Sequence, residues 1–407
     1  MSGNRQRILL LGYRPPPYFG PSVTYQALLR SSFAHQFAVT FINLSMVRDI
    51  RQLEHPGPGK VLRFCWQALQ EVWHLTTKRV AFVCLPVSVN RNAFIKDALL
   101  ARLAMLFRVP VVFYAHGNNL PDLHDRSSPR FQHFMASTIR RASGAIVLGE
   151  CLRFNFERWL PPERIRVVPT GIEPAPELPA VAKPPGIATV LYLGNLIRDK
   201  GVFVLLEAAA AIKRSGRRDV RFVFAGAWYR PQDPADFRAV VEREGLQEMV
   251  TLAGSVSGEA KWRLLAGADL LAFPTFYYYE TMGLVLLEAM QCGLPIVSTR
   301  FCSIPEIVPD GTHALLVEPR NPTQLADAIL RLVDDPQLRA AMGEVNRQRG
   351  NSYYTQQEYG ARMIAAFEAL GRCPKRKGCA PPFDPDGRND KMPMAIDRQV
   401  TNRRRTT

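Results

Sequence analysis

Short apolar runs alternate with longer amphipathic segments along most of the chain. The apolar runs predict strands, and segments with apolar residues every three to four positions predict helices. We expect strands at residues 8–11, 37–42, 80–85, 109–114, 145–148, 189–193, 220–225, 250–252, 270–274, 296–298 and 314–317. We expect helices at 22–29, 61–75, 94–107, 150–160, 202–213, 236–244, 259–266, 283–291, 321–334 and 353–370, and one that closes at 137–142. This alternation predicts an α/β protein with two Rossmann-like domains facing a central cleft.

The 407 residues are too many for one hydrophobic core, and composition suggests where the chain divides. The first domain is expected at 1–173 and the second at 187–350, joined by a linker at 174–186 that is rich in Pro and Ala. A last helix follows within 351–370. The tail 371–407 is basic and poor in apolar residues, so we expect it to be disordered.

The segment 273–298 combines strand, loop, helix, turn and strand. In such a unit the loop opens at the carboxyl edge of a parallel sheet, and the N–H groups of the helix start can hold a phosphate. Glu280 lies in the loop and Glu288 lies about two helical turns beyond it. A buried carboxylate needs partners, and the paired hydroxyls of a ribose would supply them. Alternatively, Glu280 is a solvated loop residue and Glu288 a surface residue.

Three other loops follow predicted strands. The loop 12–20 precedes a helix, which is again a candidate phosphate site. The loop 194–201 carries Arg198 and Lys200 between glycines, and these cations could stabilise a leaving diphosphate. His116 comes just after the strand 109–114, beside a glycine that lets the backbone approach a ligand. A solvated loop arginine and a structural histidine are the plainer interpretations.

Apolar content limits the classes of protein that fit. At 47% hydrophobic residues there is material for two cores, but no apolar run is long enough to span a bilayer and the N-terminus does not resemble a signal peptide. The seven cysteines lack metal-ligand spacing and indicate reduced thiols in a cytosolic protein. An Asp-x-Asp pair occurs at Asp384 and Asp386, in the expected disordered tail, so we expect no metal site.

Charge is unevenly distributed. Residues 1–170 hold 22 Lys and Arg against 9 Asp and Glu, 171–370 hold 20 against 23, and 371–407 hold 10 against 4. This asymmetry suggests an acidic partner such as anionic lipid, a phosphorylated acceptor or nucleic acid, although solvated arginines would also explain it. The helices 61–75 and 94–107 would suit a membrane interface, but we favour packing on a sheet. The arginines at 403–405 could tether the tail to a membrane.

The spacing Glu280-x7-Glu288, followed by Ala-Met-Gln-Cys-Gly-Leu-Pro-Ile-Val, resembles the signature of the retaining nucleotide-sugar glycosyltransferases of family 4, which have the GT-B fold. The loop 194–201 resembles the Gly-Arg-Leu-x3-Lys-Gly motif of that family. Lys200 matches it, whereas Asn195 replaces the usual Arg, and we expect Arg198 to substitute. The family's first loop carries paired glycines, of which this chain keeps Gly20.

The resemblance implies that the second domain binds a nucleotide sugar and the first binds the acceptor, with the last helix crossing back to the first domain. It implies catalytic roles for His116, Glu280 and Lys200 near the sugar and diphosphate, and ribose recognition by Glu288. The donor-binding residues that we predict are Gly20, Gly194, Asn195, Arg198, Lys200, Glu280, Thr281, Met282, Gly283 and Glu288.

The expected reaction is retaining transfer of a sugar, most simply from a UDP- or GDP-sugar, to a glycan or lipid-linked glycan. The setting would be cell-surface polysaccharide or glycolipid synthesis in the cytoplasm, at the inner face of the membrane, with no metal, cofactor or nucleic acid. A GT-B sugar-nucleotide epimerase and a noncatalytic basic protein that binds nucleic acid or membranes are the alternatives. A phosphorylase would need a lysine for pyridoxal phosphate, which no stretch marks, and no nucleic-acid-binding motif occurs.

Overall fold

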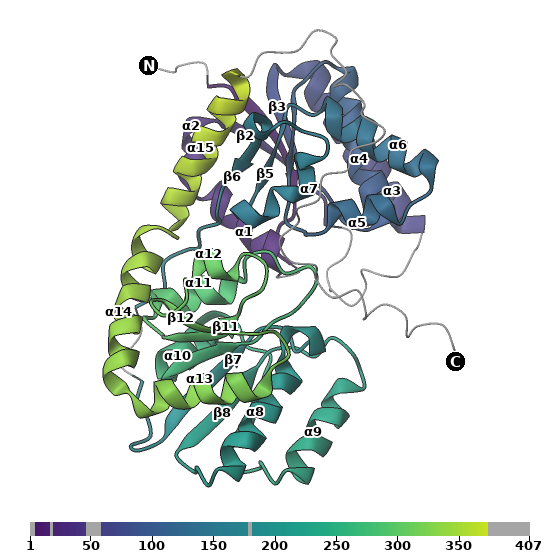
Figure 1. Cartoon of the computed structure of the whole chain (residues 1–407). Coiled ribbons are helices and arrows are strands. Elements are labelled where there is room, and N and C mark those ends of the chain that lie inside the picture. Colours follow the sequence, from purple (N-terminus) through teal and green to yellow (C-terminus); the bar gives the residue numbers. More distant parts are fainter. Residues whose placement is uncertain (1–4, 17–18, 46–57, 178–180, 373–407) are drawn as a thin grey trace. The chain divides into compact units, whose positions relative to one another are not determined.

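The computed structural model describes residues 5–16, 19–45, 58–177 and 181–372. The expectations for the tail, including Asp384, Asp386 and the arginines at 403–405, therefore lie outside the described residues. Two six-stranded parallel sheets organise the described chain, in the order β2-β1-β3-β4-β5-β6 and β12-β11-β10-β7-β8-β9 (Figure 1). Two Rossmann-like sheets are what the sequence predicts, and the predicted fold class is confirmed.

The elements of the first half are β1 (Arg7–Gly12), α1 (Gly20–Leu29), α2 (Ser32–Gln36), β2 (Ala38–Asn43), α3 (Pro58–Thr77), β3 (Val80–Pro86), α4 (Arg91–Leu106), β4 (Val111–Tyr114), α5 (Leu120–Asp125), α6 (Pro129–Arg141), β5 (Gly144–Val147), η2 (Glu150–Leu152), α7 (Phe154–Glu157), η3 (Pro162–Arg164) and β6 (Ile165–Val167). Here β6 was not predicted, and the helix expected at 150–160 is broken into η2 and α7.

The elements of the second half are β7 (Ala188–Leu193), η4 (Arg198–Lys200), α8 (Val202–Arg214), β8 (Val220–Ala225), α9 (Asp233–Arg243), β9 (Val250–Gly254), α10 (Gly258–Gly267), β10 (Leu270–Phe273), α11 (Leu284–Gln291), β11 (Ile296–Thr299), α12 (Ile304–Ile307), β12 (Ala314–Val317), α13 (Pro322–Asp334), α14 (Pro336–Ser352) and α15 (Gln356–Arg372). The strands β4, β5, β10, β11 and β12 are buried throughout, as their unbroken apolar sequences predict.

In each sheet the strand order reverses at one point, and ligands of such sheets bind there, beyond the carboxyl ends of the strands. In the second sheet this point lies between β7 and β10, which pair directly. The loops after these two strands are pressed together. A Cβ built on Gly201, whose φ is +82°, would lie 2.1 Å from the carbonyl oxygen of Pro274. Glycine at 201 therefore permits a close approach that no other residue allows.

The chain returns to the first sheet through its last two helices. The sequence predicts a helix ending before Pro336 and no further helix until residue 353, but α14 begins at Pro336. Proline is well tolerated in the first helical turn, and the Asp335 carboxylate accepts a hydrogen bond from the Leu338 N–H at 2.8 Å. The following helix, α15, packs against α1 and α2 (Figure 1). The centroid of its Phe367 ring lies 5.5 Å from the centroid of the Phe33 ring.

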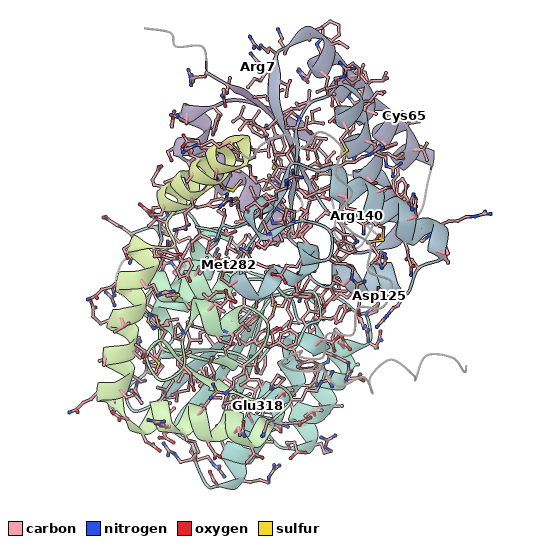
Figure 2. All side chains as sticks on the ribbon, turned by 45° about the horizontal axis from the view of Figure 1, so that its top comes forward. Arg7, Cys65, Asp125, Arg140, Met282 and Glu318 are labelled. Carbon is pink, nitrogen blue, oxygen red and sulfur yellow. The ribbon has the colours of Figure 1, made fainter. Side chains whose placement is uncertain are left out.

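Two further contacts join the halves of the described chain. The Glu306 carboxylate of α12 accepts hydrogen bonds from the N–H groups of Glu150 and Cys151, both at 2.7 Å. Met282, labelled in Figure 2, accepts a hydrogen bond through its sulfur from the Thr170 N–H at 3.2 Å. These contacts fix the second half against η2 and the end of the first half. Within the described residues, no helix combines the length and the apolar character that crossing a bilayer requires.

The helix α3 has two unlike faces. One face packs inward and buries Gln67, Glu71 and Leu75, in keeping with the favoured prediction of packing on a sheet. Both Glu71 oxygens lack a hydrogen-bond partner in the described structure, and burial raises the pKa of this carboxyl from 4.5 to about 9. The other face leaves Leu62, Trp66, Leu69 and Trp73 more than three-fifths exposed.

We predict that Glu71→Gln stabilises the protein increasingly as pH rises. Because the pKa of folded Glu71 is raised to about 9, the stability that its protonated form contributes is present below pH 4.5 and is lost as pH rises toward 9. The glutamine amide has nearly the shape of the glutamic acid side chain but does not ionise. The melting temperature of the variant should therefore exceed that of the wild type by an amount that grows from pH 5 to pH 7 to pH 9. Glu207→Gln, on the exposed face of α8, is the control, and an equal gap at every pH would contradict the assignment.

Candidate active site

A cavity of about 290 Å³ lies where loops of both sheets meet. Nine of the ten predicted donor-binding residues and all three predicted catalytic residues line it. These are Gly20, His116, Gly194, Asn195, Lys200, Glu280, Thr281, Met282, Gly283 and Glu288. The loops after β1, β4, β7 and β10 supply these residues or lead to them, because the carboxyl ends of parallel strands share one edge. The structure thus gathers residues that lie up to 268 positions apart in the chain.

Glu280 lies in the loop between β10 and α11 and is 8% exposed. Its Oε1 accepts a hydrogen bond from the N–H of Gly283, the residue that precedes α11, at 3.2 Å. Its Oε2 lies 3.2 Å from Lys200 Nζ. Gly283 adopts a φ of +60°, which favours glycine there. The carboxylate is therefore held by a helix start and a cation, and is not a solvated loop residue.

Lys200 projects from η4, at the end of the loop that follows β7. Besides Glu280, its ammonium faces the rings of Phe273 and Tyr277, at 5.7 and 5.5 Å from their centroids. The loops carrying Lys200 and Glu280 are joined by the Phe276 N–H, which donates to the Asp199 carbonyl at 2.8 Å. This arrangement places one cation in the cavity beside the start of α11, where an anion would gain from both.

Glu288 lies about one turn inside α11 and pairs with Lys261 of α10, with 2.7 Å between Nζ and Oε1. Both side chains are about three-quarters buried or more, and both residues line the cavity. A surface position for Glu288 is thereby excluded. No sequence pattern points to Lys261, because a single lysine in the helix 259–266 belongs to no motif. Its role depends on how α10 packs beside α11.

His116 follows β4 and lines the cavity from the first sheet. Its ring lies against Tyr114 and Tyr25, with centroids 4.1 and 5.1 Å apart, and its Nε2 has no hydrogen-bond partner in the described structure. Desolvation lowers the pKa of His116 to about 3, so the imidazole is neutral near pH 7. Its backbone carbonyl accepts a hydrogen bond from Thr281 Oγ1 at 3.4 Å, which ties it to the Glu280 loop.

Arg198 is the predicted donor residue that does not line the cavity. Its Nε donates to Asp233 Oδ1 at 2.7 Å, and its Nη2 bonds to Asp236. The guanidinium is therefore neutralised by two carboxylates of α9 and stacks over Phe203, 4.2 Å from the ring centroid. The expected substitution for the missing motif arginine is not observed. Among the described residues that line the cavity, the cationic side chains are Lys200 and Lys261.

Within the described ranges, no three His, Cys, Asp or Glu side chains gather in a way that could hold a metal ion. The cavity itself contains two carboxylates, and each is paired with a lysine. The expectation of metal-independent chemistry stays a prediction.

Two family models match the chain. The model described as Glycosyltransferase Family 4 matches residues 38–175, and that described as Glycosyl transferases group 1 matches residues 177–349. The matched segments together take in both sheets apart from β1, and the second contains the Glu280 and Lys200 loops.

Curated proteins with similar sequences include the α-D-kanosaminyltransferase of Streptomyces kanamyceticus, 33% identical over 182 residues, which are 45% of this chain and 46% of that protein. The D-inositol 3-phosphate glycosyltransferase of Arthrobacter sp. (strain FB24) is 32% identical over 44% of each chain. In these matches the chain spans about half the length of its relatives. The D-inositol 3-phosphate glycosyltransferase of Paenarthrobacter aurescens (strain TC1) is 24% identical, over 78% of this chain and 85% of that protein.

Solved structures show the same fold over nearly the whole chain. Sucrose-phosphate synthase from Thermosynechococcus elongatus aligns with a TM-score of 0.68 at 21% identity, covering 90% of this chain and 99% of that one. Anabaena HepE, solved in complex with UDP and glucose, aligns with a TM-score of 0.68 at 17% identity, covering 90% and 100%. With both family models and this fold in agreement, the chain belongs to the GT-B glycosyltransferases of the group 1 and family 4 type.

Proposed function

We propose that this protein is a retaining glycosyltransferase that moves a sugar from a nucleotide-sugar donor to an acceptor hydroxyl. The observation that carries the proposal is the cavity in which the Lys200–Glu280 pair, the start of α11, Glu288 and His116 converge. A diphosphate needs cations and N–H donors, whereas ribose and sugar hydroxyls need carboxylate acceptors. The cavity offers both kinds of partner: the carboxylates come from the β10–α11 loop and α11, and the lysines come from η4 and α10.

The donor in this proposal is a UDP- or GDP-sugar. Its ribose hydroxyls would donate to Glu288, its diphosphate would meet Lys200 and the N–H groups at Gly283, and its sugar would lie near Glu280 and His116. Structures of similar fold support a nucleotide sugar, since HepE was solved with UDP and with UDP-glucose. Lys261, already beside Glu288, would orient that carboxylate or contact the nucleotide.

The chemical step exchanges one bond for another at the anomeric carbon. The bond between the anomeric carbon and the diphosphate oxygen breaks as the acceptor oxygen attacks from the same face. Positive charge develops on the anomeric carbon, and negative charge develops on the departing diphosphate, where Lys200 stabilises it. Because the pKa of His116 is lowered to about 3, the imidazole is a weak base at neutral pH. Glu280 is already paired with Lys200. We therefore assign the hydroxyl proton to an oxygen of the departing diphosphate, and to His116 the positioning of the sugar.

We further propose that the acceptor belongs to cell-surface polysaccharide or glycolipid synthesis and that the enzyme works in the cytoplasm against an anionic membrane. The support is α3. Leu62, Trp66, Leu69 and Trp73 follow the spacing of one helix face and are all exposed. This set is called the α3 stripe below. Tryptophan favours the lipid headgroup region, and residues 1–170 carry a large excess of basic side chains.

Donor titration tests the site. Calorimetry without divalent metal, using UDP-, GDP-, ADP- and TDP-sugars, should find one donor that binds saturably. Glu288→Ala should weaken it about 10- to 100-fold, because charge-assisted hydrogen bonds to ribose are lost. Glu259→Ala, on the exposed side of α10, should leave the affinity unchanged. If no donor binds, the proposed donor site is wrong. If the protein epimerises free nucleotide sugar, the proposed transfer reaction is wrong.

Lys200 and Arg198 should separate catalysis from stability. Lys200→Gln is expected to lower kcat by about 10²- to 10³-fold, because it removes the positive charge that stabilises the departing diphosphate. Arg198→Gln should leave kcat nearly unchanged but lower the melting temperature, because Asp233 is buried and loses its partner. Both quantities are measured on both variants. A large fall in kcat for Arg198→Gln alone would mean that the arginine reaches the diphosphate after all.

Vesicle binding tests the membrane contact. Leu69→Glu places a charge in the α3 stripe and should reduce cosedimentation with vesicles containing anionic phospholipid, through lost insertion and added repulsion. Leu252→Glu, at an exposed leucine on β9 of the second sheet, is the matched control. Equal binding by all three proteins would exclude the stripe as the contact.

A further inference from the structure

A second cavity, of about 520 Å³, is lined in part by Pro15 and Pro16, which follow β1. Gly20 and Pro21, a few positions further along the chain, line the active-site cavity. The rest of the lining of the second cavity comes from β2, from Ser45 just after it and from α3, and includes Phe41, Asn43, Trp66 and Gln67. Described residues between β1 and α1 therefore border both cavities at the carboxyl edge of the first sheet.

Gln67 marks this cavity as a polar binding site. The side chain is 1% exposed, and its Nε2 donates to the Asn43 carbonyl at 2.9 Å. Its Oε1 has no hydrogen-bond partner in the described structure. A buried amide oxygen without a hydrogen-bond donor destabilises the folded protein. The Nε2 contact fixes the amide orientation, so the oxygen is held in place to accept a hydrogen bond.

The surroundings of Gln67 combine aromatic faces with polar groups. Trp66 and Phe41 line the cavity, and Trp66 is 61% exposed, so much of its indole is accessible. Asn43 and Ser45 add an amide and a hydroxyl. The Arg63 guanidinium donates to the Ser45 carbonyl at 3.2 Å, which closes one wall. An apolar ring face beside amide acceptors suits a sugar, which presents C–H groups on its faces and hydroxyl donors at its edge.

Trp66 also belongs to the α3 stripe. A ligand on Trp66 can therefore place its polar part in the cavity and extend its apolar part along Leu69 and Trp73. We propose that the second cavity binds a sugar unit of a glycolipid acceptor, with Trp66 stacking on the ring and Gln67 Oε1 accepting a hydroxyl hydrogen bond. This proposal rests on the proposed glycosyl transfer and names its acceptor class. The cavity holds the acceptor beside the loop that also borders the donor cavity, so contacts away from the reacting hydroxyl orient the acceptor.

The structure provides a matched pair of tryptophans for the test. Trp73 is 64% exposed on the same helix and the same stripe but does not line the cavity. The probes are octyl glycosides of glucose, galactose, mannose and N-acetylglucosamine, each below its critical micelle concentration. Binding to the full chain is measured by calorimetry, with saturation-transfer NMR on the sugar protons. Octyl tetraoxyethylene, which has the same alkyl chain and no sugar, is the reference probe.

We expect at least one octyl glycoside to bind saturably and more tightly than the reference probe. Trp66→Ala should weaken the affinity for that glycoside by about tenfold, whereas Trp73→Ala should change the affinity by less than about twofold. Gln67→Met removes the amide while keeping a similar shape, and should weaken binding if the melting temperature shows a folded protein. Nucleotide-sugar affinity should be unchanged in all three variants, because the donor cavity is separate.

Three outcomes would overturn the proposal: no glycoside binds, the reference probe binds equally well, or the two tryptophan variants lose affinity equally. The last result would indicate a nonspecific apolar surface. If nucleotide sugars fail to bind while a glycoside binds at Trp66, the donor assignment fails and the saccharide site stands. If donors bind and glycosides do not, the glycosyltransferase assignment stands and this cavity is excluded.

Discussion

The pairing of β7 with β10 positions the chemistry of the second domain. The first residues of these strands are 82 positions apart in the chain, yet the strands are neighbours in the sheet, with β8 and β11 on their outer sides. Their following loops must therefore share one opening. The Phe276 N–H bonds to the Asp199 carbonyl, and Gly201 admits Pro274 against its backbone. In these joined loops, Lys200 Nζ and Glu280 Oε2 lie 3.2 Å apart. The site is thus a consequence of strand order.

The last helix has a similar effect on the first domain. The hydroxyls of Tyr359 in α15 and Tyr114 in β4 lie 2.7 Å apart and are both buried. Tyr114 in turn lies against the imidazole of His116. The low dielectric that lowers the pKa of His116 to about 3 is therefore built partly by a segment more than 240 residues further along the chain. Packing of α15 supports the environment of a site residue as well as the core.

The sequence predicted those features that local patterns determine. Short, mostly apolar runs placed eleven of the twelve strands, and the spacing of Glu280 and Glu288 across a loop and a helix located the cavity. Arg198 was misplaced because the carboxylates that bind it, Asp233 and Asp236, come from α9, and no local pattern links them. Lys261 and Gln67 were missed for the same reason. Each acquires its role from a neighbouring element, Lys261 from α11 and Gln67 from the end of β2.

Pairing both cavity glutamates with lysines bears on which ligand the site can select. A simple phosphate could bind Lys200 only by competing with Glu280, and it would leave that carboxylate in a buried position without its cation. A nucleotide sugar brings anionic oxygens for the lysines together with hydroxyl donors for the glutamates. Both members of each pair then keep a partner when the pair opens. The two ion pairs thus penalise ligands that carry charge alone and favour those that carry charge and hydroxyls at matching distances.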